Sequence, residues 1–307
     1  MKILIFGSSG LVGTSLVKNL PKIITNSEII PSTRDDTDLF SESETLAKIK
    51  STNPDIVINA AAKVGGIQAN NINRSEFILD NLKININILE SLIPFKNVKV
   101  INLGSSCIYP LGANVPINEE SLLTGKLEPT NSPYAMAKLT AIEIGDAITK
   151  QFGHKIINLM PTNLYGPNDN FSEDHSHVIP GLIHRMHNAK VNKDNTFEVW
   201  GTGKPLREFM HVDDLTSAIG YILNNNLFSE QVLNVGSNDE ISISDLVLKI
   251  KNVVNYKGKI IFNSDMPDGN PRKLLDSTKL TSKGWKPSVE LSEGLKSVYE
   301  WYLQNKV

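Results

Sequence analysis

The chain has 307 residues, of which 40% are hydrophobic and 21% charged, with a formal net charge of −2 and a single cysteine. This length fits one large or two closely joined domains, and the near-neutral charge excludes the broad basic surface that recruits nucleic acid or an anionic membrane. One cysteine excludes an internal disulfide framework and favours a reducing, cytoplasmic compartment, and no apolar run reaches the roughly 18 residues that span a bilayer.

The first half of the chain alternates short apolar runs with amphipathic segments. Strands rich in Ile, Leu and Val are expected over residues 1–6, 29–30, 55–59, 98–103 and 155–160. Helices are expected over residues 11–20, 77–93 and 133–152, with another that ends at 46–50. Strands that alternate with helices from the first residue predict an α/β fold with a Rossmann-type doubly wound parallel sheet.

The alternation changes after Pro161, where residues 165–177 have the composition of a loop. Further helices are expected over 178–189, 242–254 and 292–303, and strands over 197–200, 208–212 and 232–236. Asp213 or Asp214 is expected to cap a helix that ends near residue 224. The pattern predicts a Rossmann domain over 1–163 plus about 206–236, and a smaller mixed α/β C-terminal substrate domain over 164–205 plus about 237–307.

A glycine-rich turn with the spacing Gly-x-x-Gly-x-x-Gly follows the first strand and opens the first helix. Glycines allow a tight turn and let the backbone approach a pyrophosphate, which then lies at the helix N-terminus. A purely structural turn is the alternative, but the strand before it and the helix after it favour dinucleotide binding. The residues concerned are Gly7, Ser8, Ser9, Gly10, Leu11, Val12 and Gly13.

The end of the second strand bears on which dinucleotide binds. An acidic residue there binds the ribose hydroxyls of NAD, whereas an arginine accommodates the 2′-phosphate of NADP. Residues 32–36 read Ser-Thr-Arg-Asp-Asp and offer both, through Arg34 and the two acids that follow it. The residues alone therefore leave both cofactors open.

A phenol and an ammonium lie one helical turn apart, at Tyr134 and Lys138. A phenol is a poor acid–base catalyst at neutral pH unless a neighbouring cation lowers its pKa, and Lys138 can supply that cation. Ser105, at the end of an apolar strand, can orient a carbonyl group. Tyr-x-x-x-Lys alone recurs by chance, but together with the glycine-rich turn, Ser105 and Pro133 it predicts reduction of a carbonyl beside a nicotinamide.

Cys107 lies two residues beyond Ser105. A buried structural thiol is the usual fate of a lone cysteine; the functional alternative is a proton-transfer base, since a thiol is easily tuned toward neutrality. His177, in a predicted loop, can complement Cys107 from the other side of a sugar ring. His184 and His187 lie close on one helix, but no cysteine is near them and no metal site is expected.

Longer stretches match a known family through nearly the whole chain. They cover residues 61–67 and 69–71, 104–110, 127–131, 134–138, 160–167, 169–171, 176–180, 200–203, 207–209, 211–214, 267–269 and 271–276. On these stretches the chain resembles the extended short-chain dehydrogenase/reductases and, within them, the GDP-L-fucose synthase family. Tyr-x-x-x-Lys marks the superfamily only, whereas Ser-Ser-Cys-Ile-Tyr-Pro together with Ser-His-Val-Ile-Pro is far more specific.

The resemblance implies roles for individual residues. Ser105, Tyr134 and Lys138 match the reductase triad, and Cys107 and His177 match the pair that inverts ring carbons. Arg34 falls where the family binds the 2′-phosphate, which favours NADPH, although the family usually has a basic residue where this chain has Ser8 and Ser9. Cofactor contacts are implied for the turn Gly7–Gly13 and for Arg34, Ala61, Ala62, Lys63, Tyr134, Lys138, Pro161, Asn163, Leu164 and His177, and substrate contacts for Arg185, Trp200, Arg207 and Lys273.

The implied activity is NADPH-dependent 3,5-epimerisation and 4-reduction of GDP-4-keto-6-deoxy-D-mannose to GDP-L-fucose, by a homodimer joined through the helices at 77–93 and 133–152. A related GDP-4-keto-dideoxy-sugar or GDP-4-keto-heptose is an alternative substrate. A 4,6-dehydratase would carry Asp-Glu where this chain has Ser106-Cys107, and a 4-epimerase of the galactose type gives no role to Cys107 or His177. A protein that only binds a dinucleotide would be free to lose the triad.

Overall fold

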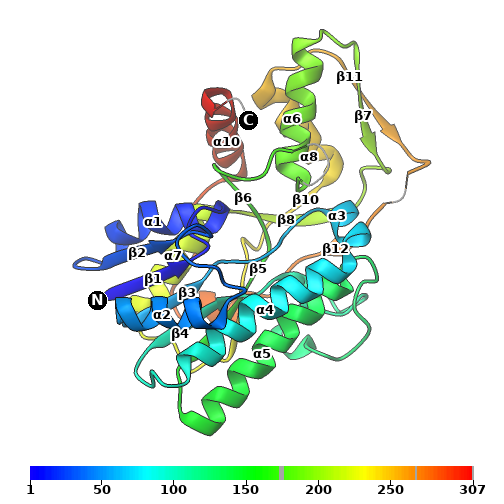
Figure 1. Cartoon of the computed structure of the whole chain (residues 1–307). Helices are drawn as coiled ribbons and strands as arrows, with labels where there is room; N and C mark the ends of the chain where they lie inside the picture. The colour runs from blue at the N-terminus through cyan, green and yellow to red at the C-terminus, as the bar shows by residue number, and fades with distance from the viewer. Residues whose placement is uncertain (173–175, 267, 306–307) are drawn as a thin grey trace.

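A six-stranded parallel sheet organises the larger part of the molecule (Figure 1). The computed structural model describes residues 1–172, 176–266 and 268–305. Its strands are β1 (Lys2–Phe6), β2 (Glu28–Ser32), β3 (Ile56–Asn59), β4 (Lys99–Leu103), β5 (Ile156–Pro161) and β9 (Val232–Val235). The order β2-β1-β3-β4-β5-β9 means that the chain leaves β1 in one direction and returns to its other side. This order confirms the predicted Rossmann-type doubly wound sheet.

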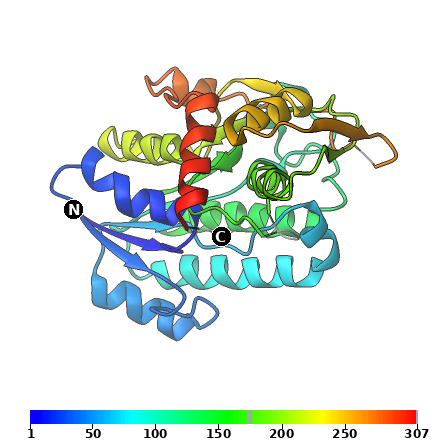
Figure 2. The same ribbon diagram turned by 90° about the horizontal axis from the view of Figure 1, so that it is seen from above.

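Helices cover both faces of this sheet. They are α1 (Leu11–Ile23), α2 (Glu42–Thr52), α4 (Arg74–Leu92), α5 (Ser132–Phe152) and α7 (Val212–Asn224). Figure 2 shows α1 and α7 on one side of the sheet and α2 and α4 on the other. Ile3 and Ile5 of β1 pack with α1 and α7, whereas Leu4 and Phe6 pack with α4 and α5. Because alternate strand residues face opposite sides, burial on both sides explains the continuous apolar runs.

The smaller part contains two further sheets. One is formed by β6 (Asn163–Tyr165), β8 (Leu206–His211), β10 (Glu240–Ser242) and β12 (Arg272–Lys273), and the other by β7 (Thr196–Trp200) and β11 (Lys259–Asn263). Helices α6 (Val178–Val191), α8 (Ile243–Val254) and α10 (Leu291–Asn305) share a separate apolar cluster with these strands. Short helices α3 (Ile67–Ile72) and α9 (Thr278–Thr281) complete the described fold, with 3-10 turns at Ser106–Ile108 and Glu119–Ser121. Of the described helices, none is long and apolar enough to cross a membrane.

Some expectations from the sequence differ from the structure. The expected capping by Asp213 or Asp214 is wrong: His211 is the N-cap of α7, and its Nδ1 accepts a hydrogen bond from the Asp213 N–H. Within the expected loop 165–177, residues 173–175 lie outside the described residues. The segment 206–236 was expected in the Rossmann domain. Its strand β9 belongs to the large sheet, but its strand β8 belongs to the smaller one. The domain limits stay a prediction.

Candidate active site

The glycine-rich turn is tightly packed against neighbouring backbone. Gly7 has a φ of +76°, and a Cβ there would lie 2.6 Å from the Ala61 nitrogen. The N–H groups of Gly7 and Ser8 donate to the Ser32 carbonyl oxygen at 3.0 and 3.2 Å, which fixes the turn beside the end of β2. A Cβ at Gly13 would lie 2.1 Å from the Gly7 carbonyl oxygen. The first and third glycines are therefore required by packing and not only by a ligand.

Replacing Gly13 by Ala should destabilise the protein by about 1–3 kcal/mol, because the added methyl group meets backbone atoms that cannot move aside. Gly10→Ala is the matched control in the same turn, since its Cβ would meet only the Gly7 carbonyl oxygen, at 3.6 Å. Urea unfolding of both variants without ligand measures the difference. An equal loss in both would contradict the packing argument.

The residues around this turn fit a dinucleotide. The buried Ser8 hydroxyl has no hydrogen-bond partner among the described residues, and no side chain caps α1 at Gly10, so the first N–H groups of the helix can receive an anion. Arg34 is exposed at the neighbouring turn. There the Asp36 carboxylate accepts hydrogen bonds from the Thr33 N–H and hydroxyl at 2.8 and 2.7 Å, which lower its pKa.

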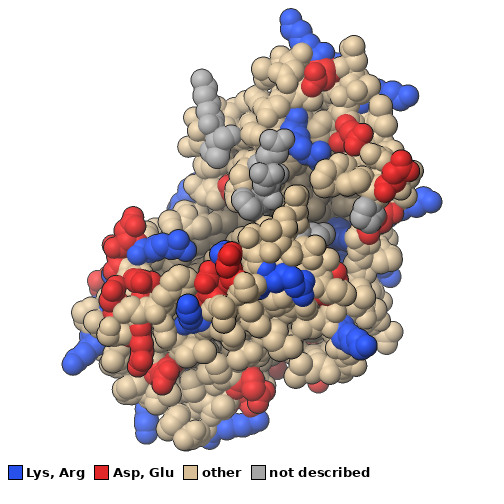
Figure 3. Space-filling model, turned by 45° about the vertical axis from the view of Figure 1, so that its right-hand side comes forward, with Lys and Arg blue, Asp and Glu red and all other residues tan. Residues whose placement is uncertain are grey.

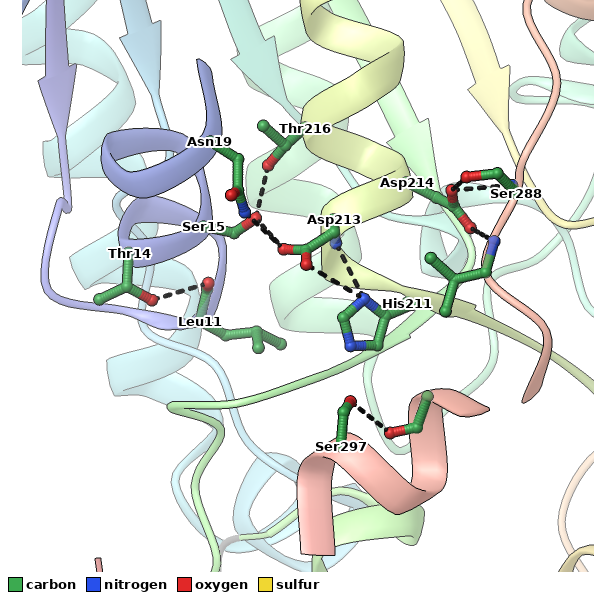
Figure 4. A network of polar contacts seen from close by, with 12 residues as sticks. Leu11, Thr14, Ser15, Asn19, His211, Asp213, Asp214, Thr216, Ser288 and Ser297 are labelled. Carbon is green, nitrogen blue, oxygen red and sulfur yellow. Dashed lines mark hydrogen bonds and ion pairs between the residues drawn. The ribbon is translucent and has the colours of Figure 1, made fainter. Parts of the chain in front are cut away.

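Hydrogen bonds between polar side chains connect helix α1 to α7. Figure 4 shows Ser15 and Asn19 of α1 directed toward Asp213, whose Oδ1 accepts from them at 2.7 and 2.9 Å. The next residue, Asp214, accepts from the N–H and hydroxyl of Ser288 at 2.9 and 3.0 Å. This network links the helix behind the glycine-rich turn to the segment that leads into α10.

Ser105, Tyr134 and Lys138 come together at the end of β4. The Ser105 hydroxyl lies close enough to the Tyr134 phenol to lower its pKa. The Lys138 ammonium is buried, lies 5.8 Å from the centre of the Tyr134 ring and donates to the Leu103 carbonyl oxygen at 2.7 Å. The triad residues predicted from the sequence therefore lie side by side, with Phe77 of α4 packed edge-on against Tyr134 at 6.3 Å.

The electrostatics of the pair differ from the expectation that Lys138 lowers the pKa of the phenol. Burial raises the pKa of Tyr134 above its usual value, the negative charge of Cys107 raises it further, and the Ser105 hydrogen bond opposes both. Burial also lowers the pKa of Lys138 to about 8. Tyr134 therefore holds a proton at neutral pH, as any phenol does, and burial makes it a weaker acid than a free phenol.

The buried ammonium of Lys138 should make stability depend on pH. Its pKa falls from 10.5 to about 8 on folding, so the penalty for burying the charge is complete below pH 8 and is relieved as the pH rises toward 10.5. Relative to Lys138→Met, the wild-type protein should gain about 2 kcal/mol between pH 7 and pH 10. Urea unfolding at both pH values measures this gain, and a constant difference between the two proteins would refute it.

Cys107 lies beside this triad, in the 3-10 turn that directly follows β4. The thiol is free and half-buried, and the N–H of Cys107 donates to the Ser105 hydroxyl at 3.2 Å. The Lys273 ammonium of β12 donates to its sulfur at 3.7 Å. The thiol is therefore part of the polar cluster around the triad and not an isolated core residue.

His177 is the N-cap of α6 and is exposed. The surrounding protein nevertheless lowers the pKa of its imidazole by desolvation. The imidazole is therefore reached by water, although neighbouring protein atoms desolvate it. The loop after β3 reaches the same place, since a Cβ at Gly66 would lie 2.7 Å from the Ser176 carbonyl oxygen. Among the described residues, no hydrogen bond joins His177 to Cys107, so their cooperation stays a prediction.

The remaining residues predicted to contact the cofactor lie around the strand ends. Ala61 and Ala62 are half-buried after β3, and Pro161 is buried at the end of β5. Leu164 packs against the apolar cluster beneath α1, and the Asn163 amide donates to the Glu208 carbonyl oxygen at 2.8 Å. The Lys63 ammonium is instead held on α4, by carboxylate oxygens of Glu76 and Asp80 at 3.2 and 3.1 Å.

The residues predicted to contact the substrate lie on α6, β7, β8 and β12 of the smaller part. Figure 3 shows that the face drawn there is hollowed near its middle. Arg207 and Lys273 are paired in register on β8 and β12, so their side chains share a face. Burial lowers the pKa of Arg207, and the charge of Asp268 opposes that shift. The Arg185 guanidinium lies 5.3 Å from the centre of the Phe197 ring. Trp200 is 58% exposed at the end of β7, free to stack on a planar ligand.

Glu208 organises this region, a role that was not predicted from the sequence. Glu208 is fully buried, and its carboxylate accepts hydrogen bonds from the N–H groups of Asn238 and Leu275 at 2.8 and 3.1 Å. Burial raises its pKa, and these bonds oppose the shift. A glutamate in a short strand beside Phe209 and Met210 is the one sequence signal of this role. The histidines considered for a metal bind tyrosines instead: Nδ1 of His184 and His187 lies 3.0 Å from the hydroxyls of Tyr302 and Tyr299.

Comparison with known proteins gives one family. The family model described as NAD dependent epimerase/dehydratase family matches residues 3–236. The putative GDP-L-fucose synthase 2 of Arabidopsis thaliana is 47% identical over 307 residues, which cover 100% of this chain and 93% of that protein. The GDP-L-fucose synthase of Escherichia coli strain K12 is 40% identical over 313 residues, covering 99% and 97%.

Solved structures agree with this result. A GDP-L-fucose synthetase from Naegleria fowleri bound to NADP has a TM-score of 0.91 at 29% identity, covering 99% of this chain and 93% of that one. A GDP-6-OMe-4-keto-L-xylo-heptose reductase from C. jejuni has a TM-score of 0.91 at 32% identity, covering 99% and 98%. The chain therefore belongs to the NAD dependent epimerase/dehydratase family, in the branch that the GDP-L-fucose synthases represent.

Proposed function

We propose that the protein is an NADPH-dependent enzyme that epimerises GDP-4-keto-6-deoxy-D-mannose at C3 and C5 and reduces it at C4, giving GDP-L-fucose. The observation that carries this proposal is that a carbonyl-reducing triad and a free thiol lie together at the end of β4. The Ser105 hydroxyl lies close enough to the Tyr134 phenol to lower its pKa, and it accepts a hydrogen bond from the Cys107 N–H at 3.2 Å. One residue thus connects a carbonyl-reducing group with a free thiol, and no reduction of a ketone needs the thiol.

The inversion uses the acidity that a 4-keto group gives to the hydrogens on C3 and C5. Cys107 and His177 remove and return protons at these carbons, while the electron pair of each broken C–H bond moves to the ketone oxygen and back. The exposed imidazole of His177 keeps a pKa below its usual value, so it is neutral and able to accept a proton near pH 7.

The reduction uses the triad. NADPH, when bound, supplies a hydride to C4. Tyr134 donates its proton to the C4 oxygen, Ser105 orients that oxygen, and the Lys138 ammonium, held by the Leu103 carbonyl at 2.7 Å, stabilises the phenolate that the transfer leaves. The glycine-rich turn and Arg34 would hold the dinucleotide, and Arg185, Arg207 and Lys273 would balance the pyrophosphate charge of the sugar nucleotide.

A related GDP-4-keto-sugar is the second candidate substrate, because the chain is similar over 99% of its length to a reductase of a GDP-keto-heptose. The test is incubation with GDP-4-keto-6-deoxy-D-mannose and NADPH or NADH in turn. Loss of nicotinamide absorbance with NADPH, and NMR of a product inverted at C3 and C5, are expected. Reduction of the heptose derivative with no turnover of the deoxymannose derivative would select the second candidate, and no oxidation with either would refute the proposal.

We infer that the protein acts as a homodimer joined through α4 and α5. Leu79 and Ile86, seven residues apart on one face of α4, are 52% and 38% exposed, and Met136 of α5 is 44% exposed. The same helices of a second copy would cover these apolar side chains. A free thiol in the site agrees with a cytoplasmic location, where thiols stay reduced.

Leu79→Asp should convert this dimer to a monomer, because it places a charge in the apolar contact. Leu248→Asp on α8 is the control, since Leu248 is 50% exposed but lies away from α4 and α5. Light scattering after size-exclusion chromatography measures both masses. A dimeric Leu79→Asp protein, or a monomeric wild type, would refute the α4–α5 interface.

A further inference from the structure

The ammonium of Lys273 is directed at the thiol of Cys107 across 166 residues of sequence, with Nζ 3.7 Å from Sγ. Both side chains are partly exposed to solvent. A cation at this distance favours the thiolate over the thiol, because it attracts the negatively charged form and not the neutral one.

The backbone that carries Lys273 is fixed on both sides, so the contact is built into the fold. On one side β12 pairs with β8, where Lys273 is in register with Arg207. On the other side, the Ile117 N–H donates to the Leu274 carbonyl oxygen at 2.8 Å. The buried Glu208 carboxylate accepts a hydrogen bond from the N–H of Leu275 at 3.1 Å.

The segment of Ile117 is itself the continuation of the chain from Cys107. It follows the 3-10 turn Ser106–Ile108, and the side chain of Ile108 packs with that of Ile117 and with Leu275 in one buried cluster. The thiol and the ammonium are therefore held by two segments that pack directly against each other. Their approach does not depend on a flexible loop.

We propose that Lys273 is a positioning residue that holds Cys107 as a thiolate before the substrate arrives. The thiol proton passes to solvent, the S–H electron pair stays on sulfur, and Lys273 remains an ammonium beside it. When Cys107 then takes a proton from a ring carbon, an S–H bond forms as the C–H bond breaks. This inference rests on the proposed function for its purpose, but the ion pair itself is a property of the free protein.

Among the groups near the thiol, Lys273 is the one placed to stabilise a negative charge on the sulfur. The other titratable group against Cys107 is Tyr134 of α5, a neutral phenol whose pKa the thiolate raises. Lys138 of the same helix donates to the Leu103 carbonyl oxygen. Arg207 lies beside Lys273 on β8 and donates to the Leu206 carbonyl oxygen at 2.8 Å. Among the described residues, Lys273 is the cation that contacts the sulfur.

The test is the rate at which iodoacetamide alkylates the protein without substrate. Cys107 is the single cysteine, so the rate reports on this thiol alone. At pH 7, Lys273→Met should react about 10-fold more slowly than the wild type, whereas Lys273→Arg should stay within about 2-fold of it. Lys257→Met is the control, because Lys257 is an exposed lysine outside the site and its loss should change nothing.

At pH 10, where thiols ionise without help, all four proteins should react at similar rates. A Lys273→Met protein that reacts as fast as the wild type at pH 7 would overturn the inference. So would a slow reaction that persists at pH 10, since it would indicate altered access and not altered ionisation.

Turnover separates this inference from the proposed function. With GDP-4-keto-6-deoxy-D-mannose in D2O, Lys273→Met should lose deuterium exchange at C3 and C5 at saturating substrate, and Lys273→Arg should restore it. A lysine that only binds pyrophosphate would raise KM and leave the alkylation rate unchanged. If the wild type fails to turn over this substrate while the alkylation pattern holds, the proposed function fails and the ion pair stands.

Discussion

Replacing Tyr134 by Phe is expected to lower the rate of nicotinamide oxidation by about 10²–10⁴-fold, the range that one positioned proton donor contributes. Phe keeps the ring that packs edge-on against Phe77 at 6.3 Å, so the fold should survive. What is lost is the proton that the C4 oxygen needs as the hydride arrives. The Tyr134 phenol, whose pKa lies far above neutral, carries that proton in the wild type.

The same variant should continue to exchange ring hydrogens with solvent, because Cys107 and His177 remain. Absorbance of the nicotinamide measures the reduction, and NMR in D2O measures the exchange at C3 and C5. Thr140→Val, two residues beyond Lys138 on α5, is the control, since its hydroxyl bonds only the Met136 carbonyl oxygen at 2.9 Å. A Tyr134→Phe protein that reduces at the wild-type rate would remove the phenol from the reaction.

The parts of this protein that could be predicted from sequence are those in which neighbours in the chain are neighbours in space. Tyr134 and Lys138 are four residues apart on one helix, and the glycine-rich turn lies between its own strand and helix. The strands β10 and β12 have only three and two residues, too short for any period, and they exist because β8 offers its edges to them. The contact of Lys273 with Cys107 depends on that pairing, so it could not be predicted.

Polar residues inside the large sheet show the same limit. Asn59, Asn102 and Asn158 are buried in adjacent strands, where asparagine is normally unfavourable. The structure places them in register, with Asn59 Nδ2 bonded to Asn102 Oδ1 at 2.9 Å and Asn102 Nδ2 bonded to Asn158 Oδ1 at 3.0 Å. Asn102, the middle member of this ladder, directly precedes Leu103, whose carbonyl oxygen accepts the hydrogen bond from Lys138. The register of three distant segments therefore supports the triad, and periodicity along the chain does not reveal it.

Lys63 shows a further limit of sequence reasoning. The resemblance implies a cofactor contact for it, but its side chain is bound to residues of α4, which the sequence alone does not show. Its ammonium bonds Glu76 and Asp80 of α4, and its backbone exchanges hydrogen bonds with the Asn81 amide at 3.1 and 3.0 Å. The loop after β3 is thereby tied to α4 before any ligand binds. Lys63 thus holds that loop against α4, close to Ser176 and the start of α6.

Replacing Cys107 by Ser should abolish inversion at C3 and C5, with a loss of about 10²–10⁴-fold in deuterium exchange. A serine hydroxyl occupies nearly the same space, and the backbone bond from residue 107 to the Ser105 hydroxyl at 3.2 Å does not involve the side chain. NADPH binding should therefore be unchanged, which fluorescence titration measures.

Tyr134→Phe and Cys107→Ser should thus each lose one of the two reactions and keep the other, because the groups for both reactions lie around Ser105. Tyr134→Phe should exchange hydrogens without oxidising NADPH, whereas Cys107→Ser should oxidise NADPH only as far as it can reduce a ketone that has not been inverted. NMR of the sugar product distinguishes them, since the hydrogens on C3 and C5 keep the stereochemistry of the substrate in the second case. If Cys107→Ser forms the inverted product at the wild-type rate, the thiol has no part in the reaction, and the contact with Lys273 is structural.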